Sequence, residues 1–253
     1  MQFDFDIKQA RKDFFTPSKY DLTPYLVDHK AKFAVVCPGG GYSMVCSYAE
    51  GIPYAQALNE MGYSAFVLRY HTKRKAKWPT PMDDLARAVR YILDNAEKFN
   101  VETEGYSVWG SSAGAHLTAC YGMEREGFRK YGLPEPGAIV LCYPGIVMDE
   151  GLSKYTLGKS STQAQKDELS PNLHVDPMYP PTFLWCCETD EVVPYWHSER
   201  MAQSLSNHGV AHQLNIYKTG KHGTGLSKGQ EAEGWFKEAI DFWERQTKTD
   251  NKL

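Results

Sequence analysis

The sequence YSVWGSSAGAHLTACYG, residues 106–122, decides the fold. Its first four residues, Tyr106–Trp109, form an apolar run typical of a buried strand, and the small residues that follow the turn are typical of a closely packed helix. Between them, Gly110–Gly114 fits Gly-x-Ser-x-Gly, in which small flanking residues allow a sharp strand-to-helix turn. Such a turn holds the central hydroxyl out at the strand end, above the N–H groups of the helix N-terminus. The sequence therefore predicts that Ser112 is a nucleophile.

Two other residues of this stretch compete for a role in the chemistry. Centring the motif on Ser111 gives Trp-Gly-Ser-Ser-Ala, which does not fit. His116 lies one helical turn after Ser112, where the helix carries it beneath the turn, so we expect a packed, hydrogen-bonded histidine rather than the base. An ordinary Gly/Ser turn is the alternative for the five residues alone, but the strand before them and the helix after them favour the nucleophile.

Short apolar runs alternate with helical patterns along the rest of the chain. Several runs are apolar on both alternating faces, which is typical of parallel strands covered on both sides. This alternation predicts an α/β fold with a mostly parallel, doubly wound sheet and helices on both faces. We expect residues 1–253 to form a single domain, with 145–181 as an insertion over the active site. The expected strands are Phe33–Cys37, Ser64–Tyr70, Tyr106–Trp109, Ala138–Tyr143, Thr182–Cys187 and His212–Tyr217, and the expected helices are Pro53–Met61, Met82–Phe99, Trp196–Asn207 and Glu231–Arg245.

A run of three glycines follows the first expected strand, in the sequence VVCPGGGY. Stabilising a tetrahedral oxyanion requires backbone N–H groups aimed at one point, and side chains would obstruct them. We expect the N–H groups of Gly39 and Gly40 to form such an oxyanion hole together with Ala113, which follows the nucleophile. A phosphate-binding loop is the alternative, but neither of the usual glycine spacings for phosphate is present.

A base and an acid are expected on loops at the carboxyl ends of strands. Asp190 follows the strand TFLWCC and is the expected acid, with Glu188 and Glu191 as alternatives. His222, on the loop after the last strand, is the expected base: it removes the Ser112 proton and then protonates the leaving alcohol, while the acid orients the imidazole. Surface or capping roles are the better interpretation of the other three candidates, His197, His208 and His212.

The composition argues against several other classes of protein. The formal net charge is −3, and the basic cluster at residues 73–77 is typical of a solvated loop, so we expect no nucleic-acid partner. No run approaches the ~18 apolar residues of a membrane span, and the N-terminal MQFDFDIKQARKDFF lacks the apolar core of a signal peptide, so we expect a cytoplasmic protein. The six cysteines lack metal-binding spacing and are expected as reduced thiols: Cys37, Cys142, Cys186 and Cys187 in or beside strands, Cys120 in a helix and Cys46 in a loop.

The motifs CPGGGY, GSSAGAHL, ETDEVVP and KHG, together with WPTPMDDLARAVRYI and ELSPNLHV, resemble those of a known family. The chain is similar over nearly its whole length to bacterial acetyl-esterase and xylan-esterase-like α/β-hydrolases, relatives of the hormone-sensitive-lipase group. The resemblance implies the α/β-hydrolase fold and hydrolysis of short acyl esters, often acetyl groups on sugars or xylo-oligosaccharides. It implies Ser112, Asp190 and His222 as the triad. Pro38 stands where many relatives have histidine, so a hydrogen bond from that histidine is absent here.

The expected substrate is a small acyl ester. The segment 145–181 is short and polar and lacks the amphipathic helix pair of a lipase lid. Tyr42, beside the oxyanion loop, is the first choice for a sugar-binding aromatic residue, ahead of Trp78, Tyr143 and Trp185, with core packing as the alternative for each. Other hypotheses are an amidase, formamidase or peptidase with the same triad, and a non-catalytic binding module. We expect no cofactor and no metal, and the sequence leaves the oligomeric state open, a homo-oligomer included.

Overall fold

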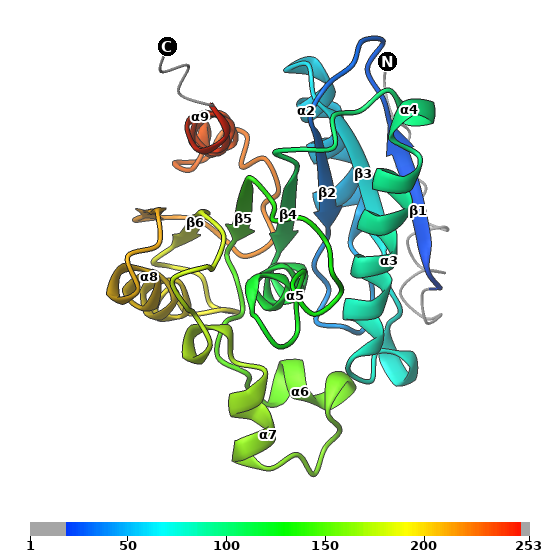
Figure 1. Cartoon of the computed structure of the whole chain (residues 1–253). Coiled ribbons are helices and arrows are strands. Elements are labelled where there is room, and N and C mark those ends of the chain that lie inside the picture. The colour runs from blue at the N-terminus through cyan, green and yellow to red at the C-terminus, as the bar shows by residue number, and fades with distance from the viewer. Residues whose placement is uncertain (1–18, 249–253) are drawn as a thin grey trace.

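In the computed structural model, which describes residues 19–248, one sheet holds seven strands in the order β1-β3-β2-β4-β5-β6-β7 (Figure 1). All neighbouring strands are parallel except β1 and β3, which pair antiparallel at one edge. The predicted mostly parallel α/β sheet is therefore confirmed. The strands are β1 Asp21–Tyr25, β2 Phe33–Cys37, β3 Ser64–Arg69, β4 Ser107–Ser111, β5 Ala138–Cys142, β6 Thr182–Cys187 and β7 His212–Tyr217.

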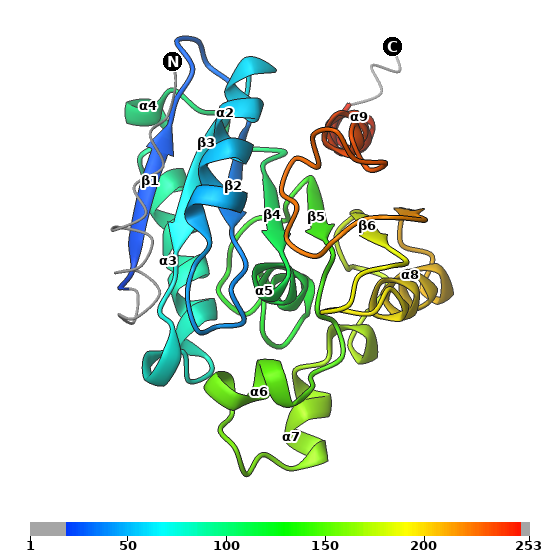
Figure 2. The same ribbon diagram turned by 180° about the vertical axis from the view of Figure 1, so that it is seen from behind.

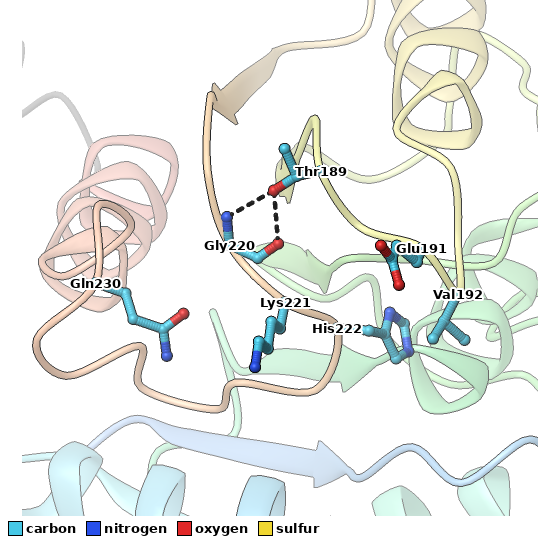
Figure 3. Close-up of a pocket in the computed structure, with 7 residues that line it drawn as sticks. All are labelled: Thr189, Glu191, Val192, Gly220, Lys221, His222 and Gln230. Atoms are coloured by element: carbon cyan, nitrogen blue, oxygen red, sulfur yellow. Dashed lines mark hydrogen bonds between the residues drawn. The ribbon is translucent and has the colours of Figure 1, made fainter.

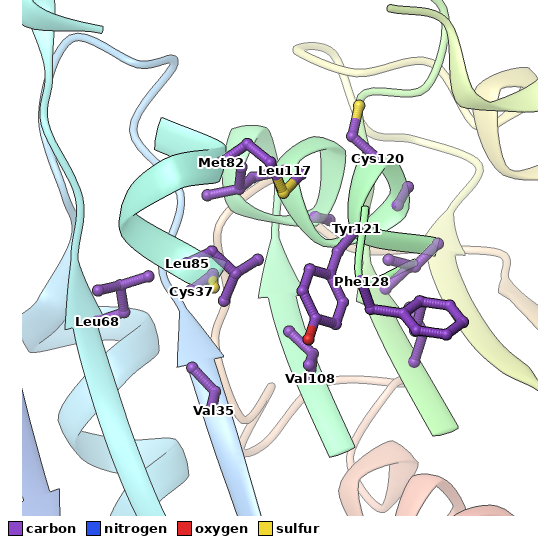
Figure 4. Packing of buried hydrophobic residues seen from close by; sticks show 14 of the residues in the cluster. Val35, Cys37, Leu68, Met82, Leu85, Val108, Leu117, Cys120, Tyr121 and Phe128 are labelled. Atoms are coloured by element: carbon purple, nitrogen blue, oxygen red, sulfur yellow. The ribbon is translucent and has the colours of Figure 1, made fainter. Parts of the chain in front are cut away.

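Helices cover both faces of the sheet, and each face has its own apolar core. On one face α3 (Thr80–Asp94), α5 (Ala113–Gly122) and α8 (Trp196–Asn207) pack against the strands, with short α4 (Ala96–Phe99) at the end of α3. Figure 4 shows this packing between Val35 and Val108 of the sheet and Met82, Leu85 and Leu117 of the helices. The opposite face carries α2 (Ile52–Glu60) and α9 (Trp235–Thr247), as the reverse view shows (Figure 2).

The expected elements are present in the structure, with some differences. The helix expected over Glu231–Arg245 begins only at Trp235, as α9. The six predicted strands are present with ends that differ by a residue or two, but β1 was not predicted, because DLTPY contains proline and aspartate and becomes a strand only by pairing with the edge of β3. The predicted helix Met82–Phe99 is divided at Asn95 into α3 and α4. The N-terminal stretch used to exclude a signal peptide lies outside the described residues.

Parallel strands carry three loops to the same edge of the sheet. Ser111 of β4 pairs with Cys142 of β5, and Cys142 pairs with Trp185 of β6, so the chain after each strand emerges at the carboxyl edge. The segment 145–181 forms α6 (Glu150–Thr156), α7 (Gln163–Glu168) and the short turn Pro171–Leu173. It lies at this edge beside α5 (Figure 1). Within residues 19–248, no helix combines the length and apolarity needed to cross a membrane.

Candidate active site

The turn between β4 and α5 places Ser112 in a backbone conformation that few residues adopt. Its φ is 53° and its ψ is −119°, whereas the residues on both sides are buried in regular structure. The flanking glycines are required by close contacts. A Cβ on Gly110 would lie 2.3 Å from the Gly114 carbonyl oxygen, and a Cβ on Gly114 would lie 2.0 Å from the Cys37 carbonyl oxygen. The turn therefore forms only with glycine at these two positions, as the Gly-x-Ser-x-Gly motif predicts.

Three side chains from three strand ends form a continuous hydrogen-bonded chain. His222 Nε2 lies 2.8 Å from Ser112 Oγ, and His222 Nδ1 lies 2.7 Å from Asp190 Oδ2. Since a carboxylate only accepts hydrogen bonds, Nδ1 carries the proton and Nε2 is left to accept the serine proton. The structure thus brings together the nucleophile, base and acid candidates named from the sequence, in the geometry that the predicted roles require.

Asp190 is held as a carboxylate by donors that converge on it. Its side chain is only 1% exposed, and burial alone would raise its pKa. The hydrogen bond from His222 and the N–H groups of Val193 and Val192, which donate to Oδ1 at 3.0 and 2.8 Å, outweigh burial, so the pKa lies below its ordinary value. Glu188 and Glu191, the alternatives for the acid, are exposed. Asp190 therefore provides a fixed negative charge beside the imidazole at neutral pH.

Of the three predicted oxyanion donors, the structure leaves Gly40 and Ala113 available. Ala113 is the first residue of α5, and the carbonyl of Gly40 turns away to accept from Ser43 and Met44. Within residues 19–248, neither N–H has a protein acceptor. The prediction for Gly39 is wrong, because its N–H already donates to Glu50 Oε2 at 2.6 Å. The sequence could not show this contact, since it joins residues eleven positions apart in different loops.

The prediction that Tyr42 contacts substrate is also wrong in this structure. Its φ of 54° turns the side chain inward, where it is fully buried and its hydroxyl donates to His116 Nδ1 at 2.8 Å. His116 in turn donates from Nε2 to the Leu169 carbonyl, so it is the packed histidine predicted from its position in the helix. Tyr143 and Trp185 are buried as well, and of the four aromatic candidates only Trp78 is partly exposed.

The other three candidate histidines bond to groups away from the reacting atoms. A surface or capping role was expected for His197, but it is buried, and its Nδ1 accepts from the N–H groups of Ile146 and Val147 on the loop after β5. Nδ1 of His208 and of His212 lies within hydrogen-bond distance of a backbone carbonyl nearby in the chain. Residues 19–248 contain no group of three histidine, cysteine, aspartate or glutamate side chains placed to hold a metal, and all six cysteines are free thiols.

A hollow of about 890 Å³ opens beside the base, between the loops that follow β6 and β7. Figure 3 shows its polar wall, in which Lys221 lies between Gln230 and His222, and Thr189 bonds to Gly220. Ser112 is not part of the lining, so the hollow lies on the histidine side of the site. It offers space and hydrogen-bonding groups to whatever part of a ligand extends past the imidazole.

The sequence gives no indication of Glu50 in this site, and it names Tyr143 only as a candidate sugar-binding aromatic residue, not as a partner of Glu50 and His222. The Tyr143 hydroxyl donates to Glu50 Oε1 at 2.8 Å, and its ring packs edge-on against His222 with centroids 5.0 Å apart. Tyr143 follows β5 directly with a φ of 38°, which is uncommon for a bulky residue. A glutamate beside Gly51 and Pro53 gives no sequence signal of its own, because its partners come from other strand ends.

The chain is similar in sequence to a known family and to several known hydrolases. The family model BD-FAE matches residues 22–131. Endo-1,4-beta-xylanase B of Butyrivibrio fibrisolvens is 30% identical over 91% of this chain, and the acetylxylan esterase of Xylanibacter ruminicola is 28% identical over 87%. This chain spans only 40% and 45% of those two proteins.

A solved structure matches over most of both chains. The acetyl ester-xyloside bifunctional hydrolase from Caldicellulosiruptor lactoaceticus is 33% identical, with a TM-score of 0.82 and coverage of 91% of this chain and 89% of that one. The sheet order, the serine turn and the shared identity over nearly complete chains lead to one assignment. This chain belongs to the BD-FAE family of α/β-hydrolases.

Proposed function

We propose that the protein is a serine carboxylesterase that removes short acyl groups, acetyl first among them, from sugars or xylo-oligosaccharides. The observation that carries the proposal is the continuous chain from Ser112 Oγ through the His222 imidazole to Asp190, beside the Gly40 and Ala113 N–H groups. Relatives support the substrate class, since one is named an acetylxylan esterase and another an acetyl ester-xyloside hydrolase.

The reaction follows from the positions of the protons. Ser112 Oγ attacks the ester carbonyl while its proton passes to His222 Nε2, and the carbonyl oxygen becomes an oxyanion that accepts from Gly40 and Ala113. The imidazolium then gives that proton to the leaving alcohol, which departs as the acyl-enzyme forms. Water enters, loses a proton to Nε2 and attacks the acyl carbon, and Ser112 is released with the acid. Asp190 stabilises the imidazolium in both halves of the cycle.

Two features support a small acyl group on a polar alcohol. The only apolar residue of α7, QAQKDE, is an alanine, and α6 buries its leucine, Leu152, so neither helix of the segment 145–181 offers the apolar face of an interfacial lid. The hollow beside His222 carries Lys221, Gln230 and Glu191, which can bind the hydroxyl groups of a leaving sugar.

The direct test is turnover of p-nitrophenyl esters from acetate to dodecanoate, with acetylated xylo-oligosaccharides as the second substrate set. We expect acetate to be hydrolysed fastest, and Ser112→Ala to lower kcat by at least ~10⁴-fold. Ser111→Ala is the matched control, because Ser111 is the competing serine and its hydroxyl bonds to Tyr54 rather than His222.

Other outcomes would redirect the proposal. A folded wild type that turns over formanilides or amides but not esters would indicate an amidase. A wild type that reacts with no substrate and is not labelled at Ser112 by a fluorophosphonate would contradict a catalytic role altogether.

A further inference from the structure

Glu50 is a buried carboxylate that the reaction described above does not use. It lies in the π-helical turn Ser47–Gly51, between the oxyanion loop and α2, and only 3% of its surface is exposed. Each of its oxygens accepts one strong hydrogen bond: Oε2 from the Gly39 N–H at 2.6 Å, and Oε1 from the Tyr143 hydroxyl at 2.8 Å. Burying a carboxylate is costly unless it is paired in this way.

The first partner links Glu50 to the oxyanion hole. Gly39 is the residue before the donor Gly40, and it lies against the nucleophile, since a Cβ on Gly39 would fall 2.9 Å from Ser112 Cβ. Fixing the N–H of Gly39 fixes the peptide plane that precedes it and restricts the backbone leading to the next N–H. The bond to Glu50 therefore orients the loop from which Gly40 donates.

The second partner links Glu50 to the base. The Tyr143 ring packs edge-on against His222, and the backbone beside that histidine approaches Glu50, because a Cβ on Gly223 would lie 3.7 Å from Oε1. One carboxylate thus lies between the two loops that the reaction must keep in register, the glycine loop and the histidine loop.

The charge of Glu50 has one catalytic group to act on. Burial raises the pKa of Glu50 above its ordinary value, because it outweighs the bonds from Gly39 and Tyr143 and the nearby His222, all of which lower it. Its other titratable neighbours are neutral at moderate pH: burial raises the pKa of Cys46 to about 12 and the pKa values of Tyr54, Tyr70, Tyr143 and Cys142 above their ordinary range. No lysine or arginine within residues 19–248 contributes to its electrostatics. An imidazolium on His222 is therefore the cation that this carboxylate stabilises.

We propose that Glu50 is a positioning residue of the ester hydrolase: it orients the oxyanion loop through Gly39 and, with Tyr143, favours the protonated His222 that forms as Ser112 attacks. The proposal rests on the proposed function. Both effects act on the charged transition state rather than on bound substrate, so they change kcat more than KM.

Glu50→Gln tests it, because glutamine keeps the shape and an acceptor for Gly39 but removes the charge. We expect kcat for p-nitrophenyl acetate to fall roughly 10-fold, less than the ~100-fold typical of deleting an oxyanion donor itself, with KM changed by less than about twofold. A nearby negative charge favours the protonated base, so without it the acidic limb of the kcat/KM profile moves to lower pH. Asp84→Asn is the matched control: this fully buried carboxylate pairs with His71 and Arg87, and its loss should lower Tm without moving the acidic limb.

Tyr143→Phe is the second variant and keeps the proposal testable if Glu50→Gln does not fold. It removes only the hydroxyl and leaves the ring against His222, and we expect a smaller loss of kcat with unchanged KM. Folded Glu50→Gln or Tyr143→Phe protein with the wild-type kcat and the wild-type acidic limb would overturn the proposal. A change in KM alone, with the wild-type kcat, would also overturn it. A wild type without esterase activity or fluorophosphonate labelling would instead contradict the proposed function, so the two failures are distinguishable.

Discussion

Ser112 stands on a turn whose neighbouring residues are all buried, whereas His222 lies on a loop, residues 218–234, in which only Gly225, Ser227 and Ala232 are buried. The serine turn leaves a central strand and is fixed by backbone atoms that leave no room for a side chain. The histidine loop leaves the edge strand β7 and is held by a few hydrogen bonds, among them Thr189 with Gly220 and Glu231 with Thr219. One half of the reacting pair is fixed by packing and the other by separate, replaceable contacts.

The largest expected effect comes from a glycine-to-alanine substitution at the serine turn, compared with the same substitution on the histidine loop. In Gly114→Ala the new Cβ would lie 2.0 Å from the Cys37 carbonyl oxygen, so we expect the free energy of unfolding to fall by about 3 kcal/mol or more and esterase activity to be lost. In Gly229→Ala, on the histidine loop, the new Cβ meets nothing within 4 Å, and only the positive φ of 71° costs about 1 kcal/mol. Denaturant unfolding measures the free energy of unfolding of both variants. Equal losses would contradict the difference in packing between the serine turn and the histidine loop.

The second prediction concerns the loss of folding stability at acidic pH, to which His116 near the serine turn contributes. His116 lies beneath the turn, where burial lowers its pKa to about 4 from an ordinary 6.5. Between these values the unfolded chain binds the proton and the folded chain does not, so the contribution of neutral His116 is full above about 6.5 and is lost as pH falls toward 4, by up to about 3 kcal/mol. Tm measured from pH 7.5 to 4.5 should therefore fall less steeply in His116→Asn.

The control for that series is His208→Asn, which alters an exposed imidazole and should follow the wild-type slope. His197, buried with its pKa also lowered to about 4, contributes in the same direction. A His116→Asn slope equal to that of the wild type would remove the assignment of this acid sensitivity to the helix beneath the turn.

The smallest expected effect is at an exposed anchor of the histidine loop. Glu231 accepts from the N–H groups of Lys218 and Thr219 and from the Thr219 hydroxyl, and these bonds lower its pKa. In Glu231→Gln we expect faster amide hydrogen exchange at residues 218 and 219, with kcat within about threefold of wild type, because solvent replaces the lost bonds. A loss of activity as large as that of Gly114→Ala would show that the loop is not held by replaceable contacts.

The same contrast explains what could be predicted from the sequence. The Gly-x-Ser-x-Gly turn is formed by residues adjacent in sequence, and its small residues indicate a sharp strand-to-helix turn. Ser112 and the strand and helix around it could therefore be predicted from the pattern. The acid and base candidates followed from chain order and strand ends, and the structure brings Asp190 and His222 to Ser112. These inferences needed only short-range patterns and the topology of a parallel sheet.

The errors concern contacts between distant segments. Gly39 was expected to donate into the oxyanion hole, but Glu50 from a different turn accepts its N–H. Tyr42 was expected to face a sugar, but a left-handed backbone conformation directs it to His116. Neither the partner nor the backbone conformation is encoded by residue type alone, because both depend on which loops the fold brings together.

The contact between Gly114 and the carbonyl oxygens of Cys37 and Pro38 also has a consequence for thermal motion. Backbone of α5 rests directly on the backbone that leads into the glycine loop, without a side chain between them to rotate or compress. The helix and the loop are therefore expected to fluctuate as one body, so the Gly40 and Ala113 N–H groups and Ser112 Oγ move in phase. The distances among these three groups should vary less than the distance from Ser112 Oγ to the imidazole. The position of His222 is therefore expected to be the most variable part of the site.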